Sequence, residues 1–367
     1  MHVLLRQQAE LVRSKGYPAE EHVTVTEDGY VLSLQRVPRG ARQLPGPFTG
    51  PPVLLVHGLL SSAAVWVLNY PHQSLGFLLA DAGYDVWLGN YRGTPYSRGH
   101  LEFSDSNSRY WDFSLDEVGL LDLPALVDYV LDHTGWPQLF LVGFSQGSAA
   151  AWAMLADKPH YNNKASAIVA NQGRLLVRPQ WLRRATYAMC ESPLRYVCAL
   201  PTFFFFGVNL NQLNQMRLLM AWVQYCNKLT THAYELLHLH PEHWTETERK
   251  YLGGERETQS RLAVYTSHLP SGASKRNVEQ FAQVDSPAYD FSKIRAPVAL
   301  FSAHKDFFAN PDDVSTLRQS LPNVVLDYIV PDLEFSHMDF ILGTEAAAFV
   351  YRPLIYFMDY WVLLYGP

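Results

Sequence analysis

Short apolar runs alternate with helix-length segments along most of this chain, and this alternation is the strongest constraint on its fold. The runs of strand length are 53–56, 85–88, 139–142, 167–170, 298–302 and 325–330. Each of the first three is followed by turn residues and then by a longer amphipathic stretch. The repeated order of strand, turn and helix predicts an α/β fold, in which helices cover both faces of a mostly parallel sheet.

Two regions depart from this rhythm. Residues 22–36 predict a β-hairpin, because apolar residues flank the turn Glu27-Asp28-Gly29. The block 174–290 loses the alternation and carries the run Phe203–Phe206, whose simplest interpretation is core packing. Helices are predicted in this block near 212–229 and 245–252.

The domain organisation follows from where the alternation stops and resumes. Residues 1–173 and 291–367 are expected to form one core around the sheet. Residues 174–290 are expected to form a helical cap, or lid, inserted over that sheet.

Composition excludes several classes of protein. With 48% hydrophobic and 17% charged residues among 367, the chain can bury a large core and is not intrinsically disordered. A net charge of −6 without a long Lys/Arg run argues against nucleic-acid binding. No uninterrupted apolar run reaches the length of a membrane span; Arg352, Pro353 and Asp359 interrupt the nearest one, 346–366.

Signals for location are few. The N-terminus has no apolar run of signal-peptide length, and no Asn-x-Ser/Thr glycosylation signal occurs. The cysteines are Cys190, Cys198 and Cys226, which permit one disulfide and one free thiol, or three reduced thiols.

Residues 143–147 read Gly-Phe-Ser-Gln-Gly, a G-x-S-x-G motif. The motif follows the apolar run 139–142 and precedes a helix-forming stretch that begins at Ser148. In the α/β-hydrolase fold, this succession of strand, tight turn and helix presents a nucleophilic serine on a sharp corner. We therefore predict that Ser145 is a nucleophile; the alternative is an ordinary serine in a glycine-rich turn.

A serine hydroxyl needs a base to take its proton, and in this fold the order along the chain is Ser, Asp/Glu, His. The acid is expected after the next-to-last strand, 298–302, where Asp306 is our choice. Asp312 and Asp313 are alternatives on the same loop, but both follow Pro311 and are typical of a helix start.

The histidine is expected in the loop after the last strand, 325–330, where His337 lies. At that place it can take the proton from Ser145 and later return it to the leaving group.

Acyl transfer also needs hydrogen-bond donors for the oxyanion. The backbone N–H of Leu59 follows the strand 53–56, where this fold places one such donor, and the N–H of Gln146 is its expected partner. His57 in the same loop is expected to brace the loop rather than to act as a base.

Other motifs are weak. Residues 89–93, Gly-Asn-Tyr-Arg-Gly, are not a dinucleotide fingerprint, and no phosphate-binding loop motif occurs. A local histidine cluster consists of His232, His238, His240 and His243. Its spacing fits no zinc motif, so a polar cap surface is the better interpretation.

Further segments form a specific pattern across most of the chain outside the middle block. They are Gly16–Pro18, Thr26–Tyr30, His57–Leu60, Ala82–Asn90, Asp122–Ala125, Gly143–Gly147, Ser267–Gly272 and His337–Phe340. On these segments the chain resembles the acid lipase family of gastric, lysosomal and insect digestive lipases. The run 82–90 is far more specific than the G-x-S-x-G motif alone.

The resemblance implies a lipase that hydrolyses triacylglycerols or sterol esters, without cofactor or metal, under a cap lined by apolar residues. It supports Ser145, Asp306 and His337 as a catalytic triad, with the amides of Leu59 and Gln146 as oxyanion donors. The implied partner is a lipid ester, with transient contact between the cap and a lipid interface.

The resemblance also implies a secreted or lysosomal location and a cap disulfide, for which Cys190 and Cys198 are candidates. The chain departs from the family pattern at 171–174, where an Ala-Pro-containing turn is usual. The alternatives are a small-ester or thioester hydrolase with the same triad, and an inactive lipase-like protein that binds lipid.

Overall fold

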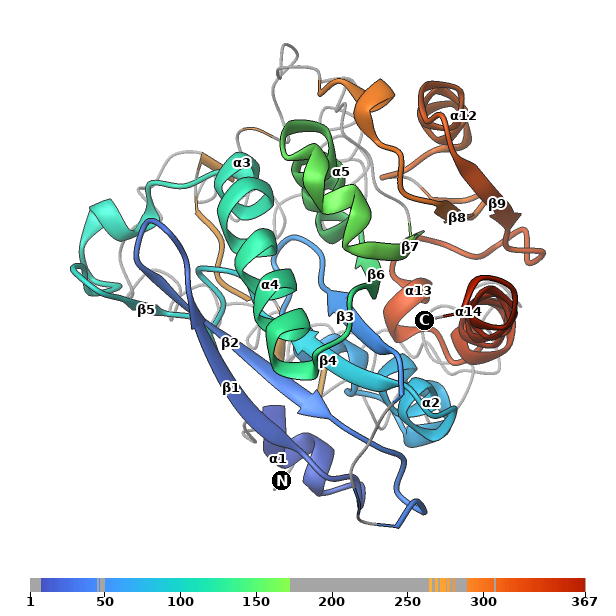
Figure 1. Ribbon diagram of the computed structural model, residues 1–367, viewed down its shortest axis with the longest axis horizontal. Coiled ribbons are helices and arrows are strands. Elements are labelled where there is room, and N and C mark those ends of the chain that lie inside the picture. Colours follow the sequence, from blue (N-terminus) through green and yellow to red (C-terminus); the bar gives the residue numbers. More distant parts are fainter. Residues whose placement is uncertain are drawn as a thin grey trace, which may run out of the picture.

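The structure, a computed structural model, describes residues 8–44, 46, 50–171, 264–265, 268–269, 271–274, 276–277, 280, 289–306 and 308–366. One sheet runs through this part of the chain (Figure 1). Its strands are β1 (Glu20–Val25), β2 (Tyr30–Val37), β3 (Pro52–Val56), β4 (Asp85–Gly89), β5 (Gly99–His100), β6 (Leu139–Phe144), β7 (Ala165–Asn171), β8 (Val298–Ser302) and β9 (Val324–Ile329).

The spatial order of the strands is β1-β2-β4-β3-β6-β7-β8-β9, with β5 paired to β2. All neighbours from β4 to β9 are parallel, whereas β2 pairs antiparallel with β1, β4 and β5. The sheet is therefore mostly parallel, with an antiparallel hairpin at one edge.

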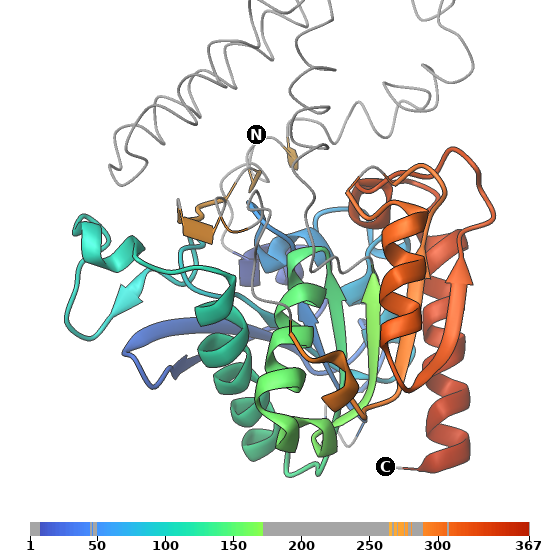
Figure 2. The same cartoon turned by 90° about the horizontal axis from the view of Figure 1, so that it is seen from above.

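Helices cover both faces of the sheet (Figures 1 and 2). The first face carries α1 (Gln8–Arg13), α2 (Leu75–Asp81), α13 (Asp339–Leu342) and α14 (Arg352–Tyr365). The second face carries α3 (Leu115–Glu117), α4 (Leu123–Thr134), α5 (Gln146–Asp157) and α12 (Pro311–Ser320). The helices thus form one layer on each side of the strands, as the α/β alternation predicts.

Strand β3 shows why the central strands are continuous apolar runs. Val53 and Leu55 contribute to the core on the first face, and Leu54 and Val56 to the core on the second. Successive side chains of a strand point to opposite faces, so coverage of both faces requires every position to be apolar. Edge strand β1 alternates between exposed and half-buried positions instead.

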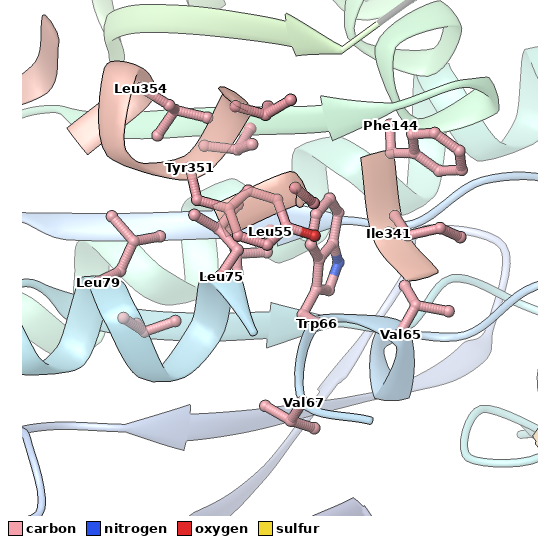
Figure 3. Packing of buried hydrophobic residues seen from close by; sticks show 14 of the residues in the cluster. Leu55, Val65, Trp66, Val67, Leu75, Leu79, Phe144, Ile341, Tyr351 and Leu354 are labelled. Atoms are coloured by element: carbon pink, nitrogen blue, oxygen red, sulfur yellow. The ribbon is translucent and has the colours of Figure 1, made fainter. Parts of the chain in front are cut away.

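The first core packs the C-terminal segments against the chain that follows β3 (Figure 3). Trp66, in the loop after β3, is 1% exposed and shares this core with Leu75 of α2 and Leu354 of α14. Tyr351, directly before α14, is also buried there, and its hydroxyl donates to the carbonyl of Phe340 at 2.7 Å. The C-terminal helices are therefore part of the core.

The predicted fold class is confirmed, and the strand predictions agree with the structure to within a few residues at their ends. The predicted hairpin over 22–36 is β1 and β2. Strand β5 and the π-helical turns at Val118–Asp122 and Ala347–Tyr351 were not predicted.

The chain leaves the sheet after β7 and returns at β8, its parallel neighbour. The expected cap, 174–290, falls between these strands and lies largely outside the described residues, so the domain division stays a prediction. Cys190, Cys198, Cys226 and the run 203–206 also lie outside them. Among the described helices, none is both long and apolar enough to span a membrane.

Candidate active site

Ser145 occupies the sharp turn between β6 and α5, as the G-x-S-x-G motif predicts. Its backbone has φ 52° and ψ −115°, and it is the residue directly before the first turn of α5. A positive φ is strained for a residue with a side chain and persists only where the surroundings enforce it. The turn leaves Ser145 partly accessible, although the strand before it and the helix after it are buried.

The motif glycines are required by close backbone contacts. A Cβ on Gly147 would lie 2.4 Å from the carbonyl oxygen of Val56, and one on Gly143 would lie 2.6 Å from the backbone nitrogen of Ser148. Neither position has room for a side chain. The absence of Cβ at these positions is what lets α5 start directly against the end of β3.

His337 and Asp306 are brought together from the loops after β9 and β8. The Nδ1–H of His337 donates to Oδ2 of Asp306 at 2.8 Å. The other carboxylate oxygen of Asp306 accepts the backbone N–H groups of Phe308 and Ala309, each at 2.7 Å. These bonds fix the carboxylate, which in turn orients the imidazole with its Nε2 as the basic nitrogen.

The imidazole lies beside the serine turn. The His337 ring packs against that of Phe144, the residue before Ser145, with centroids 4.8 Å apart. Phe308 lies on it as well, at 4.9 Å. His337 is only 8% exposed and Asp306 only 2%. Burial of the pair keeps water from competing for their hydrogen bond.

The alternative acids lie elsewhere. Asp312 and Asp313 are in the first turn of α12, where the Asn310 side chain caps the N–H of Asp313 at 3.0 Å. Acidic residues in a first helical turn are favoured by the helix dipole. Their position agrees with the interpretation as helix-start residues.

The loop after β3 lies directly against the serine. A Cβ on Gly58 would be 3.2 Å from the Cβ of Ser145. The backbone at Gly58 therefore lies close to the nucleophile, and a side chain there would be crowded. Leu59 follows in this loop, and Leu60 has a positive φ of 55°. The Leu60 carbonyl accepts the N–H of Ser271 at 2.7 Å, which ties the loop to a distant segment.

Gln146 is the first residue of α5, so its N–H has no acceptor within the helix. Its side chain is fully buried, and the amide nitrogen donates to Oδ1 of Asn277 at 3.1 Å. The expected residues are thus placed around one turn: His337 and Asp306 are bonded to each other beside Phe144, Gly58 before Leu59 contacts Ser145, and Gln146 follows Ser145 directly.

His57 is completely buried and braces the loop, as expected, because its Nδ1–H donates to the Gly58 carbonyl at 2.9 Å. Burial lowers the pKa of His57 to about 3, so the ring is neutral at ordinary pH. It takes no part in the His337–Asp306 pair.

The segment after β4 was missed as part of the site. The Tyr91 hydroxyl donates to the Gly58 carbonyl at 2.6 Å, and Oδ1 of Asn90 accepts the N–H of Ala63 at 2.9 Å. The segment 89–93 is not a dinucleotide fingerprint, and the run 82–90 indicates only the family, so neither pattern predicts that Tyr91 contacts the loop after β3. The position of the segment 89–93 after a strand adjacent to β3 is what brings it to the site.

Arg92, the next residue, holds this segment in place. Its guanidinium is 1% exposed and pairs with Asp122, which is fully buried, at 2.6 Å, and with Asp28 at 2.7 Å. The Arg92 backbone N–H also donates to Asp122 at 2.9 Å. Buried charges of this kind persist only when paired, so the network fixes the path of the chain next to Tyr91.

One group of side chains in the described part of the chain could hold a metal ion: Glu20, His22 and His133. It lies on β1 and α4, away from the serine turn. The Glu20 carboxylate already pairs with Arg36 at 3.0 Å, and Glu20 and His133 are exposed. We assign no metal chemistry to it.

Comparison with known proteins agrees with this geometry. Residues 51–344 match the family described as alpha/beta hydrolase fold, and residues 8–70 match the partial alpha/beta-hydrolase lipase region. The chain belongs to the acid lipase family of α/β-hydrolases. The resemblance seen in the sequence is thereby confirmed.

Relatives in this lipase family match along nearly the whole chain. Lipase member M of Mus musculus is 33% identical, covering 95% of this chain and 85% of that protein. Lipase 3 of Drosophila melanogaster is 33% identical, covering 94% and 91%. Gastric triacylglycerol lipase of Mus musculus is 31% identical, covering 95% and 91%.

Solved structures agree in fold. An esterase from Thermogutta terrifontis has a TM-score of 0.55 at 13% identity. The match covers 93% of the chain described here and 99% of the esterase chain. A putative aryl esterase from Burkholderia cenocepacia has a TM-score of 0.54 at 17% identity, and the match covers 94% of the present chain and 100% of the esterase chain. At such low identity the likeness concerns the fold alone.

Proposed function

We propose that this protein is a lipase that hydrolyses carboxylic esters of lipids, triacylglycerols or sterol esters, through an acyl-enzyme on Ser145. The observation that carries the proposal is the buried His337–Asp306 hydrogen bond of 2.8 Å beside a serine held at a positive φ. A nucleophile on a strained turn, an imidazole and an orienting carboxylate are the parts that ester hydrolysis requires.

In the proposed reaction, Nε2 of His337 takes the proton of the Ser145 hydroxyl as its oxygen attacks the ester carbonyl. Asp306 stabilises the imidazolium that forms. The backbone N–H groups of Leu59 and Gln146 donate to the oxyanion of the tetrahedral intermediate. His337 then protonates the departing alcohol, and a water that His337 deprotonates releases the fatty acid.

The lipid substrate is proposed on the names of the relatives. Members of the family at 31–33% identity over most of the chain are lipases, one of them a gastric triacylglycerol lipase. A secreted or lysosomal location is proposed on the same resemblance, as is the transient contact of residues 174–290 with a lipid interface.

The test is hydrolysis of p-nitrophenyl esters and glycerol esters with short and long acyl chains, at acidic and neutral pH. We expect a preference for long chains, and complete loss of activity and of phosphonate labelling in Ser145→Ala. The matched control is Ser74→Ala, which removes the hydroxyl of a different serine, also directly before a helix, and should keep full activity.

Activity that survives in Ser145→Ala would refute the assignment of the nucleophile. A wild-type preference for short esters or thioesters would support a small-ester or thioester hydrolase with the same triad. Wild-type protein without hydrolysis or labelling would indicate a lipid-binding relative.

A further inference from the structure

The backbone carbonyl of Gly58 is held by two side chains next to the proposed site. The Tyr91 hydroxyl donates to it at 2.6 Å and the His57 Nδ1–H at 2.9 Å. The two rings are stacked, with centroids 3.9 Å apart. Tyr91 is 3% exposed and His57 is fully buried. The carbonyl oxygen thus accepts from two fixed donors, which uses both of its lone pairs.

The Gly58 carbonyl and the Leu59 N–H belong to one planar peptide group. Fixing the direction of the C=O therefore fixes the direction of the N–H. Hydrogen bonds to a C=O also polarise the peptide group and make its N–H a stronger donor. Within the described residues, the Leu59 N–H has no hydrogen-bond acceptor, so it is available to a developing oxyanion.

Burial determines the protonation state of both donors. Burial raises the pKa of Tyr91 well above its usual value, so its hydroxyl keeps its proton. A carbonyl oxygen can only accept, so the neutral His57 ring carries its proton on Nδ1. Its Nε2 is then buried without a partner among the described residues, an arrangement that destabilises the fold. A buried atom left unpaired in this way needs an explanation beyond packing.

We propose that Tyr91 and His57 are positioning residues that clamp the 58–59 peptide and aim the Leu59 N–H at the oxyanion. The inference rests on the proposed function of the site. The Tyr91 hydroxyl also lies 3.4 Å from Oε1 of Gln146, the residue that supplies the second oxyanion donor. One hydroxyl therefore contacts the peptide that carries the Leu59 N–H and the side chain of the residue that supplies the other proposed donor.

The test is Tyr91→Phe, which keeps the ring and its stacking but removes the hydroxyl. Because loss of a direct oxyanion donor costs about 10²–10³-fold in kcat, loss of one of two positioning bonds should lower kcat about tenfold, with KM nearly unchanged. The Ki of a trifluoromethyl ketone, whose serine adduct carries an oxyanion at the same position, should rise by a similar factor. His57→Asn tests the other half of the clamp and should likewise lower kcat and raise Ki while leaving KM nearly unchanged.

The matched control is Tyr351→Phe, because Tyr351 is equally buried and its hydroxyl also donates to a backbone carbonyl, that of Phe340. It should keep wild-type kcat and Ki. Wild-type kcat and Ki in Tyr91→Phe would overturn the clamp, and so would an equal loss in Tyr351→Phe, which would indicate general destabilisation. Retained activity in Ser145→Ala would instead overturn the proposed function itself.

Discussion

The buried His57 predicts a specific loss of stability in acid. Its pKa is lowered from 6.5 to about 3 in the folded protein by burial, which disfavours the charged ring. In the unfolded chain the ring takes up a proton below its ordinary pKa, whereas the folded protein does not until pH falls to about 3. Between these pH values the unfolded state binds more protons, so the free energy of unfolding decreases as pH falls.

The magnitude follows from the two pKa values. At pH 8 both states are neutral at His57, and at pH 4.5 only the unfolded state is protonated. Linkage then gives a loss of about 2.7 kcal/mol from this group between pH 8 and pH 4.5. That is a large part of the stability of an ordinary domain.

The assay is urea unfolding of the wild type and His57→Gln at both pH values, monitored by tryptophan fluorescence. The contributions of the other titrating groups cancel when the free energy of unfolding of the wild type is subtracted from that of the variant. Between pH 8 and pH 4.5 this difference should shift by about 2.7 kcal/mol in favour of the variant. His160→Gln, at an exposed histidine, is the matched control for the chemical change. A difference that is the same at pH 8 and pH 4.5 would refute the reasoning.

Other predictions concern single contacts. Asp306→Asn should lower kcat by about 10³–10⁴-fold, because the amide no longer orients His337 correctly; ester hydrolysis within tenfold of wild type would contradict this. Gly147→Ala should cost about 1–3 kcal/mol of stability in urea unfolding, since its Cβ would lie 2.4 Å from the Val56 carbonyl. An unchanged unfolding midpoint would show that the turn can relax. Asp122→Ala should cost about 3–5 kcal/mol, measured in the same way, because it leaves buried Arg92 without its inner partner. A cost below about 1 kcal/mol would mean that Asp28 alone suffices.

The parts of the fold that could be predicted from the sequence are those that local pattern determines. Strand β3 is recognisable because burial on both faces leaves four successive apolar residues. Ser145 is recognisable because its turn needs glycines at 143 and 147, and these follow a strand and precede a helix. The order of loops along the chain then indicates Asp306 and His337 as its partners.

The parts that could not be predicted depend on which strands become neighbours. Tyr91 contacts Gly58 across 33 positions of sequence, and Gln146 contacts Asn277 across 131. Nothing in the pattern of apolar residues specifies that β4 lies beside β3, and only that placement brings Tyr91 to the loop after β3. The burial of Asp122 could not be predicted either, because it depends on the ion pair with Arg92.

The strand order also has a consequence for protein synthesis. Ser145 follows β6, whereas Asp306 and His337 follow β8 and β9, which join the sheet at the edge beyond β7. On the proposed mechanism, a nascent chain carries its nucleophile long before the ribosome has made the base that activates it. On that mechanism, the activated serine exists only after the last strands have been made, and a chain cut short by premature termination lacks it.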